Sequence, residues 1–246
     1  MRLLIGIDDT DNKESRGTGF KARQLAKQIE EAGFGTVKGI TRHQLYVHDD
    51  IAYTSQNSSA CLDVDSDKFD EIKLFCAEYL KNEAAEGSDA GLCIAEWDTV
   101  SVEIRKWGER AKKEVLNLND AIEIAKKNTV YLEGFTGTLI GQIGALAAVG
   151  LRKEGNDGRF IWLRGVRELR DFDAGVYTVK ELKQDAGIDK VQTKDGIEVP
   201  ENERVNCNGW TRPILLKNSA VLLVENSNFA DYGWKTSSKE YIRTIS

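Results

Sequence analysis

Cysteine pairs and long apolar runs are missing from this chain of 246 residues. Its four cysteines are far apart and form no CxxC pair, which argues against a structural zinc site and a disulfide framework. Reduced, buried thiols are the expected state, as in a cytosolic protein. No segment approaches the roughly 20 apolar residues that span a bilayer. The N-terminus leads directly into an expected core strand, so we predict no signal peptide and a cytoplasmic location without membrane contact.

Proline, histidine and excess positive charge are also scarce. The two prolines form no linker, and His43 and His48 are weak evidence for catalysis and weaker evidence for a metal site. The net charge of −6 argues against a broad basic surface for nucleic acid but leaves a local basic groove open. A hydrophobic content of 41% and a charged content of 30% are typical of a soluble globular protein with one large or two small domains.

The most informative segment that is present is a cluster of acids near the N-terminus. An apolar run at residues 3–7 stops at Asp8, Asp9, Thr10 and Asp11, which indicates a buried strand with acids at its carboxyl end. Mg²⁺ takes oxygen ligands and bridges one or two carboxylates to substrate phosphates, so it suits such a cluster. The same spacing equally fits a solvated turn in which an aspartate caps the next helix.

Thr18 lies between Gly17 and Gly19, at the start of an expected helix. Its hydroxyl is suited to cap that helix, to contact a phosphate or to accept a phosphoryl group. Capping is the more common role of a threonine at such a position.

The first part of the chain is expected to alternate strands and helices, and the last part to consist of short strands and tight turns. Asn119 or Asp120 is the predicted cap of the second of two helices at 99–127. The other expected strands are 2–8, 35–45, 60–65, 91–97, 129–133, 159–163, 213–217 and 220–225, with helices at 19–32, 68–82 and 139–150 and a hairpin turn at 194–196.

A glycine-rich segment precedes the helix expected at 139–150. Gly134, Gly137, Gly141 and Gly144 would let the backbone approach a phosphate at a helix N-terminus. The spacing matches neither the Walker nor the Rossmann pattern, and small residues for helix packing are the alternative explanation. Two phosphate-compatible loops in one chain are most simply two walls of one site.

A densely polar segment at 42–59 supplies candidate substrate contacts. Hydroxyl, amide and guanidinium groups suit hydrogen bonding to sugar or phosphate, and loops of this kind often carry function. A loop that is polar only because it is solvated is the alternative. The candidates are Arg42, His43, Thr54 and Asn57.

Five segments, taken together and in order, resemble one family. They are GIDDTD at 6–11, GTG at 17–19, TRHQL at 41–45, YTSQNSS at 53–59 and IGALAAVG at 143–150. This set resembles the catalytic part of the archaeal isoleucine-tRNA agmatinylcytidine synthetase family. Those enzymes use ATP to activate the carbonyl oxygen of an anticodon cytidine, which the amine of agmatine then displaces. The family combines a kinase-like domain, a ferredoxin-like domain, an OB-fold and a zinc ribbon.

The resemblance implies an α/β (α+β) fold with ATP and Mg²⁺ as cofactors. It implies a kinase-like ATP-binding domain at 1–165 and a smaller ferredoxin-like or hairpin-rich subdomain at 166–246. Asp8, Asp9 and Asp11 correspond to the family's metal–nucleotide motif, and Thr18 to its phosphoryl-handling threonine. Residues and resemblance together predict Asp8, Asp9 and Thr18 as catalytic, with these nucleotide contacts: Thr10, Gly17, Gly19, Gly134, Gly137 and Gly141.

The predicted function is an ATP- and Mg²⁺-dependent enzyme, phosphotransferase-like or ligase-like. It would activate an oxygen of an acceptor that is a small molecule, a nucleotide or RNA. The alternative is a nucleotide-binding or regulatory module without turnover. Within these 246 residues we expect neither an OB-fold nor a zinc ribbon, because little length remains for the first and the four cysteines form no CxxC pair for the second. We therefore expect weak RNA binding by this chain alone at physiological salt, and no agmatine transfer to intact isoleucine tRNA.

Overall fold

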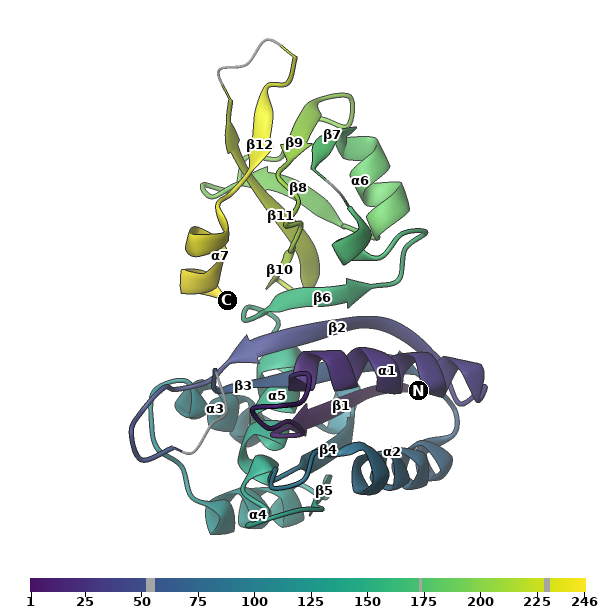
Figure 1. Cartoon of the computed structure of the whole chain (residues 1–246), viewed down its shortest axis with the longest axis vertical. Helices are drawn as coiled ribbons and strands as arrows, with labels where there is room; N and C mark the ends of the chain where they lie inside the picture. Colours follow the sequence, from purple (N-terminus) through teal and green to yellow (C-terminus); the bar gives the residue numbers. More distant parts are fainter. Residues whose placement is uncertain (52–55, 173, 228–230) are drawn as a thin grey trace. The chain divides into compact units, whose positions relative to one another are not determined.

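The computed structural model divides the chain into two compact units, Met1–Glu154 and Gly155–Ser246 (Figure 1). It describes residues 1–51, 56–172, 174–227 and 231–246. The elements of the first unit are β1 (Arg2–Asp8), α1 (Thr18–Glu31), β2 (Thr36–Gln44), β3 (Ser58–Asp65), α2 (Phe69–Glu83), β4 (Gly91–Glu96), a 3₁₀ turn (Trp97–Thr99), α3 (Val102–Ala111), α4 (Leu118–Lys127), β5 (Tyr131–Gly134) and α5 (Gly141–Glu154).

The sheet of the first unit is antiparallel, with strand order β5-β4-β1-β3-β2. The first six elements follow one another as β-α-β-β-α-β with spatial order β4-β1-β3-β2, which is the ferredoxin-like arrangement. Helices α1 and α2 cover one face of this sheet, and α5 lies behind the other (Figure 1). Because both faces are covered, the central strand β1 is apolar along nearly its whole length and buried.

Gly6 brings α5 close to the middle of β1. It pairs with Cys61 on one side and Cys93 on the other, and a Cβ at this position would lie only 2.1 Å from the Ala145 carbonyl oxygen. A larger residue would push the helix away. The apolar residues of α3, α4 and α5 pack on this face around Leu4, Trp107 and Leu146. This packing sets the N-terminal end of α5 beside the carboxyl end of β1.

The second unit is rich in strands and has its own core. Phe160, Phe172, Leu182, Val205 and Leu222 are among the buried residues of that core. Its elements are β6 (Arg159–Leu163), a 3₁₀ turn (Leu169–Asp171), β7 (Gly175–Thr178), α6 (Val179–Ala186), β8 (Lys190–Thr193), β9 (Arg204–Cys207), β10 (Ile214–Leu216), β11 (Ser219–Asn226), β12 (Trp234–Thr236) and α7 (Lys239–Ile245). The strand order is β6-β10-β11-β12-β9-β7, and β8 pairs with β11 in parallel.

The mixed α/β fold class is confirmed, but two details of the predicted organisation differ. The boundary falls after residue 154 rather than 165, because β6 pairs with β10 of the second unit at Arg159 and Ile214. The ferredoxin-like order of elements occurs in β1 to β4 rather than at 166–246. Pairing between strands that are distant in the sequence decides both features, and local periodicity cannot predict such pairing.

One helix cap also differs from the prediction. The side chain of Asn117 caps α4 by accepting the amide of Asp120, so neither Asn119 nor Asp120 is the cap. The helix begins two residues earlier than the expected cap implies. Within the part of the chain that the structure describes, no helix is long and apolar enough to cross a membrane.

Candidate functional site

A cleft in the first unit lies where β1 ends and α5 begins. Asp8, Asp9, Asp11 and Thr18 line one side of it, and the start of α5 at 140–144 lines another. Polar residues at 56–58 and an apolar group complete the walls, the latter including Leu45, Ala111 and Leu116. The cleft therefore has an acidic end and a more apolar end.

The acidic end holds carboxylates that repel one another. Burial raises the pKa of Asp8 well above its usual value, and the charges of Asp9 and Asp11 raise it further. Burial raises the pKa of Asp9 from 3.8 to about 6, with Asp89 and Asp11 adding to the shift. A backbone hydrogen bond from Asp89 opposes part of it. The ionised acids thus lack enough nearby positive charge to compensate them.

Thr18 is the first residue of α1, and its side chain does not cap the helix. Gly17 is the N-cap, and the Asp11 carboxylate accepts both the Thr18 amide, at 2.9 Å, and the Thr18 hydroxyl, at 2.8 Å. The Thr18 hydroxyl oxygen in turn accepts bonds from the amide and hydroxyl of Thr10, at 3.3 and 3.2 Å. Capping by Thr18 is therefore wrong for this chain, because Asp11 performs that task.

Glycines let the start of α5 contact the acidic loop directly. A Cβ on Gly144 would lie 1.8 Å from a carboxylate oxygen of Asp8, so only glycine fits there with Asp8 in place. A Cβ on Gly141 would lie 2.2 Å from the Asp89 carbonyl oxygen and 3.1 Å from that of Asp8. Gly141 and Gly144 line the cleft. The positive end of the α5 dipole thus lies close to the acids.

The other two glycines of the segment have packing roles in this structure. A Cβ on Gly134 would lie 2.7 Å from the Cβ of Leu139, and a Cβ on Gly137 would lie 2.2 Å from a carboxylate oxygen of Asp89. Neither residue lines the cleft in the described part of the chain. Their predicted contact with nucleotide stays a prediction, and the contacts that explain them are internal.

The predicted substrate residues are not all gathered at the cleft. Asn57 lines it, and its side-chain amide donates to the Tyr46 carbonyl at 2.7 Å. Arg42 donates to Gln56 at 2.9 Å from β2, outside the described lining of the cleft. His43 is fully buried in β2, where Nε2 and the Thr41 hydroxyl are 2.8 Å apart. Thr54 lies outside the described residues.

Thr10, Gly17 and Gly19 support the acidic loop rather than line the cleft, as far as the described residues show. Thr10 is fully buried against Thr18. Gly17 is the N-cap of α1, and Gly19 belongs to the first turn of that helix. Alternation along β2 explains the burial of His43, whose side chain takes an inward position of that strand. The sequence pattern instead placed His43 in the polar segment at 42–59.

Asp89 is a residue of the site that sequence reasoning missed. Its carboxylate accepts the amide and the hydroxyl of Thr138, the latter at 2.8 Å, while its own amide bonds to Asp9. It precedes β4 and belongs to no recognisable motif. The pairing of Asp8 with Gly91 across β1 and β4 brings it to the site. Only the pairing register of β1 with β4 identifies Asp89 as a residue of the site, and this register exists only in the folded sheet.

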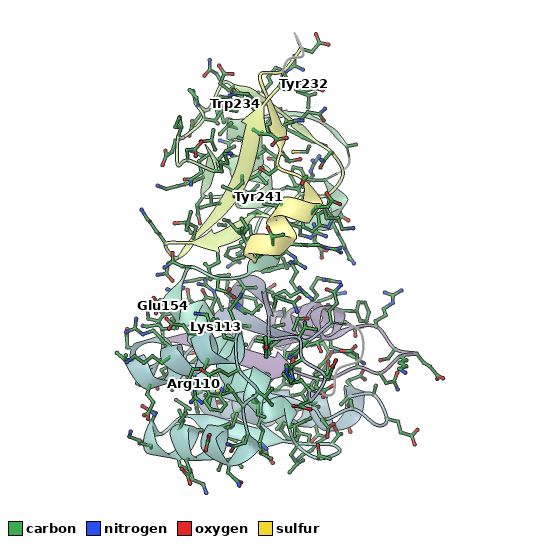
Figure 2. All side chains as sticks on the ribbon, turned by 90° about the vertical axis from the view of Figure 1, so that its left-hand side faces the viewer. Arg110, Lys113, Glu154, Tyr232, Trp234 and Tyr241 are labelled. Carbon is green, nitrogen blue, oxygen red and sulfur yellow. The ribbon has the colours of Figure 1, made fainter. Side chains whose placement is uncertain are left out.

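The helical face around α3 is not uniformly basic. Figure 2 shows Arg110, Lys113 and Glu154 on one side of the first unit. Arg110 pairs with Glu114 at 3.0 Å, and Arg105 pairs with Glu154 at 2.9 Å. These pairs offset positive charge that a local nucleic-acid groove would need.

No preformed metal site is visible among the described residues. No group of three or more histidine, cysteine, aspartate or glutamate side chains in 1–51, 56–172, 174–227 and 231–246 is arranged to hold a metal ion. The acids at the cleft therefore do not form a complete protein cage for a cation.

The fold and the cleft define an α/β protein with an acidic site between β1 and α5, and comparisons with known proteins agree with this class. No protein-family model matches the chain. It is 30% identical over 159 residues to the isoleucine-tRNA 2-agmatinylcytidine synthetase TiaS of Archaeoglobus fulgidus, covering 63% of this chain and 37% of that protein. It is 27% identical over 153 residues to an uncharacterised protein of Methanocaldococcus jannaschii, covering 61% of this chain and 50% of that protein.

Solved structures of TiaS are similar to part of the chain. The crystal structure of apo TiaS has a TM-score of 0.54 at 25% identity, over 61% of this chain and 35% of TiaS. The complex of TiaS with its tRNA and ATP has a TM-score of 0.54 at 26% identity, over 61% of this chain and 36% of TiaS. The predicted resemblance to the agmatinylcytidine synthetases is thus confirmed over about three-fifths of the chain, which spans half or less of the length of these relatives.

Proposed function

We propose that this chain is an ATP- and Mg²⁺-dependent enzyme that activates an oxygen of an acceptor by phosphoryl transfer in the cleft of the first unit. The observation that carries the proposal is the contact of the poorly compensated Asp8 carboxylate with Gly144 at the start of α5, in a cleft that Asp9 also lines. The similarity to TiaS, which has been crystallised with ATP, supports ATP as the nucleotide.

The donor set at the acidic end fits Mg²⁺ that arrives with a nucleotide. Mg²⁺ is usually held by one or two carboxylates together with substrate phosphates, so a three-ligand protein cage is not required. Asp8 and Asp9 would hold it, and their raised pKa values support a site where added positive charge is favourable. A cation bound there would neutralise part of the negative charge of the phosphates.

The chain's own groups would bind and orient the phosphates. The start of α5 lines the cleft, so the positive end of its dipole favours an anion there, although the amides of Gly141 and Ile143 already donate to carbonyl oxygens of the chain. The Thr18 hydroxyl, held by Asp11 at 2.8 Å, lies on the same cleft and can contact a terminal phosphate. The apolar end near Leu45 and Leu116 is suited to a planar base or an apolar part of the acceptor.

Calorimetric titration with ATP, with and without Mg²⁺, tests the metal assignment. We expect Asp8→Asn to weaken ATP binding at least about tenfold in Mg²⁺ and to change it little in excess EDTA. Asp70→Asn is a matched control, because Asp70 is exposed on α2 and pairs only with the nearby Lys73. Equal affinities of wild-type and Asp8→Asn proteins in Mg²⁺ would overturn the assignment.

A turnover assay separates the enzyme from the nucleotide-binding module. Labelled ATP is incubated with the protein and a metabolite extract, and AMP, ADP, phosphate and pyrophosphate are measured. Release of a product that depends on both the extract and Asp8 supports the enzyme and allows purification of the acceptor. ATP binding without any product in the presence of a complete extract would favour the module.

A further inference from the structure

Asp89 hydrogen-bonds to both the acidic loop and the glycine-rich segment, although it belongs to neither. Its amide donates to the Asp9 carboxylate. Its carboxylate accepts the amide and hydroxyl of Thr138, and its carbonyl accepts the Gly141 amide at 3.0 Å. A single residue thus joins the two sides of the cleft.

We propose that Asp89 is a positioning residue that fixes the separation between the acids at the end of β1 and the N-terminus of α5. Phosphates bound in the cleft, near the positive end of the α5 dipole, would then lie at the distance from Asp8 and Asp9 that one bridging cation requires. The inference rests on the proposed function and adds a residue to it. Asp89 acts through Asp9 and Thr138 and is not proposed to touch the nucleotide.

The glycines around Asp89 are fitted to its side chain and main chain. A Cβ on Gly137 would lie 2.2 Å from the Asp89 carboxylate, and a Cβ on Gly141 would lie 2.2 Å from its carbonyl oxygen. Gly137 also has a φ of +55°, in the left-handed region that glycine adopts readily. The glycine-rich segment therefore closes around Asp89, which explains two of the glycines without a bound phosphate.

Two residues in unfavourable backbone conformations lie next to this contact. Asp9 has a φ of +50° and Leu139 a φ of +66°, values that are uncommon for residues with a side chain. Asp9 bonds to the Asp89 amide, and Leu139 follows Thr138 directly. Such conformations persist only where surrounding bonds enforce them, and they cluster at functional sites.

The carboxylate of Asp89 can be changed without removing the neighbouring hydrogen bonds that hold the segment 134–141 beside β4. The Ala90 amide donates to the Thr136 hydroxyl at 2.8 Å, and the Phe135 amide donates to the Ala90 carbonyl at 2.8 Å. These bonds would remain in an Asp89→Ala protein, which loses only the two hydrogen bonds that Thr138 donates to the carboxylate. Asp89→Asn keeps an acceptor oxygen for Thr138 and removes the charge.

The test compares wild type, Asp89→Ala, Asp89→Asn and the control Asp70→Ala. Binding of ATP in Mg²⁺ and of adenosine is measured by calorimetry and competition, and amide hydrogen exchange is followed across 134–141 and across β1. In Asp89→Ala we expect faster exchange at 134–141 only, and a preference for ATP over adenosine reduced at least about tenfold. In Asp89→Asn the preference should stay within about threefold of wild type, and Asp70→Ala should match wild type.

A role in stability alone would weaken both ligands alike and leave the preference for ATP unchanged, which would overturn the inference. If Asp89→Asn fails as badly as Asp89→Ala, charge rather than geometry is required, and the positioning role is also overturned. If wild-type protein does not bind ATP in Mg²⁺, the proposed function fails and this inference fails with it. Normal ATP binding by wild type with an unaffected Asp89→Ala protein refutes the inference alone.

Discussion

Thr18 shows how much one hydroxyl can depend on its surroundings. It is only 6% exposed, lines the cleft, and is bonded to Asp11 and Thr10. Because Asp11 already accepts the Thr18 amide, the first turn of α1 keeps its capping bond without the hydroxyl. The hydroxyl is therefore not required to cap α1, so an effect of its removal on turnover would report on the site rather than on the helix.

We expect Thr18→Ala to fold and to consume ATP at least about tenfold more slowly than wild type, which equals about 1.4 kcal/mol in the barrier. Thr18→Ser should recover part of the rate, because it restores the bond to Asp11. The measurement is turnover at saturating ATP, with the fold checked by circular dichroism. A wild-type rate in Thr18→Ala would remove Thr18 from the chemistry.

Asp9 makes stability depend on pH in a direction opposite to that of an ion-paired aspartate. Its pKa rises from 3.8 to about 6 in the folded protein, so between these values the folded state binds more protons than the unfolded state. The contribution of Asp9 to the free energy of unfolding then falls as pH rises from about 4 to 6, by no more than about 1.4 kcal/mol per pH unit for one proton. Below 3.8 both states are protonated and this contribution is fully present.

Urea unfolding without metal, at several pH values between 4 and 7, checks this expectation. Asp9→Asn should flatten the part of the slope that Asp9 causes, and it should be more stable than wild type near neutral pH. Asp70→Asn is a suitable control, because Asp70 is exposed on α2 and pairs with Lys73 rather than with a histidine. A slope that is identical in wild type and Asp9→Asn would contradict the assignment of the shift.

At the scale of elements, α4 tests whether a cap is set by sequence or by structure. The Asn117 side chain accepts the Asp120 amide at 3.0 Å, and its own amide donates to the Asp120 carboxylate at 2.7 Å. Asn117→Ala should cost about 1 kcal/mol of unfolding free energy, as loss of a helix N-cap usually does. Asn119→Ala, at an exposed position inside the helix, should cost nothing or stabilise slightly.

Chemical denaturation of the two α4 variants provides the measurement. The prediction is contradicted if the two substitutions change stability equally. The comparison is sharp because both substitutions replace an exposed asparagine by alanine, two residues apart, and only Asn117 makes the capping bond.

At the scale of the whole molecule, the cleft draws its described lining from the first unit alone. That unit has its own buried core around Leu4, Trp107 and Leu146. We expect a fragment of residues 1–154 to fold and to bind ATP in Mg²⁺ within about threefold of the full chain. Calorimetry on the fragment and on the full chain gives the comparison.

A fragment of residues 1–165 is the matched control for that prediction. It adds β6, whose pairing with β10 of the second unit would be lost, so its exposed strand edge should increase aggregation without improving affinity. If the 1–154 fragment is folded by circular dichroism and does not bind ATP, residues of the second unit contribute to the site.

Local patterns were sufficient for most elements of the first unit, but they did not predict α6, α7, β7, β9 or β12 of the second. The apolar run ending in acids predicts β1 and its loop, and the structure has that strand at Arg2–Asp8. The apolar periodicity at 19–32 predicts α1, which spans Thr18–Glu31. These features depend on neighbouring residues only, because strand alternation, helix periodicity and charge repulsion act over a few positions of the chain.

By itself, then, the sequence determined the mixed α/β class and most helices and strands, and it predicts that the acidic and glycine-rich segments favour a cation and a phosphate. The tertiary structure alone decided that Asp11 rather than Thr18 caps α1, that His43 faces inward, and that Asp89 joins Asp9 to Thr138. It also decided the unit boundary after Glu154. The physical reason is strand pairing: the register of β1 with β3 and β4 brings residues about 50 to 90 positions apart within hydrogen-bond distance, and short-range periodicity does not contain that register.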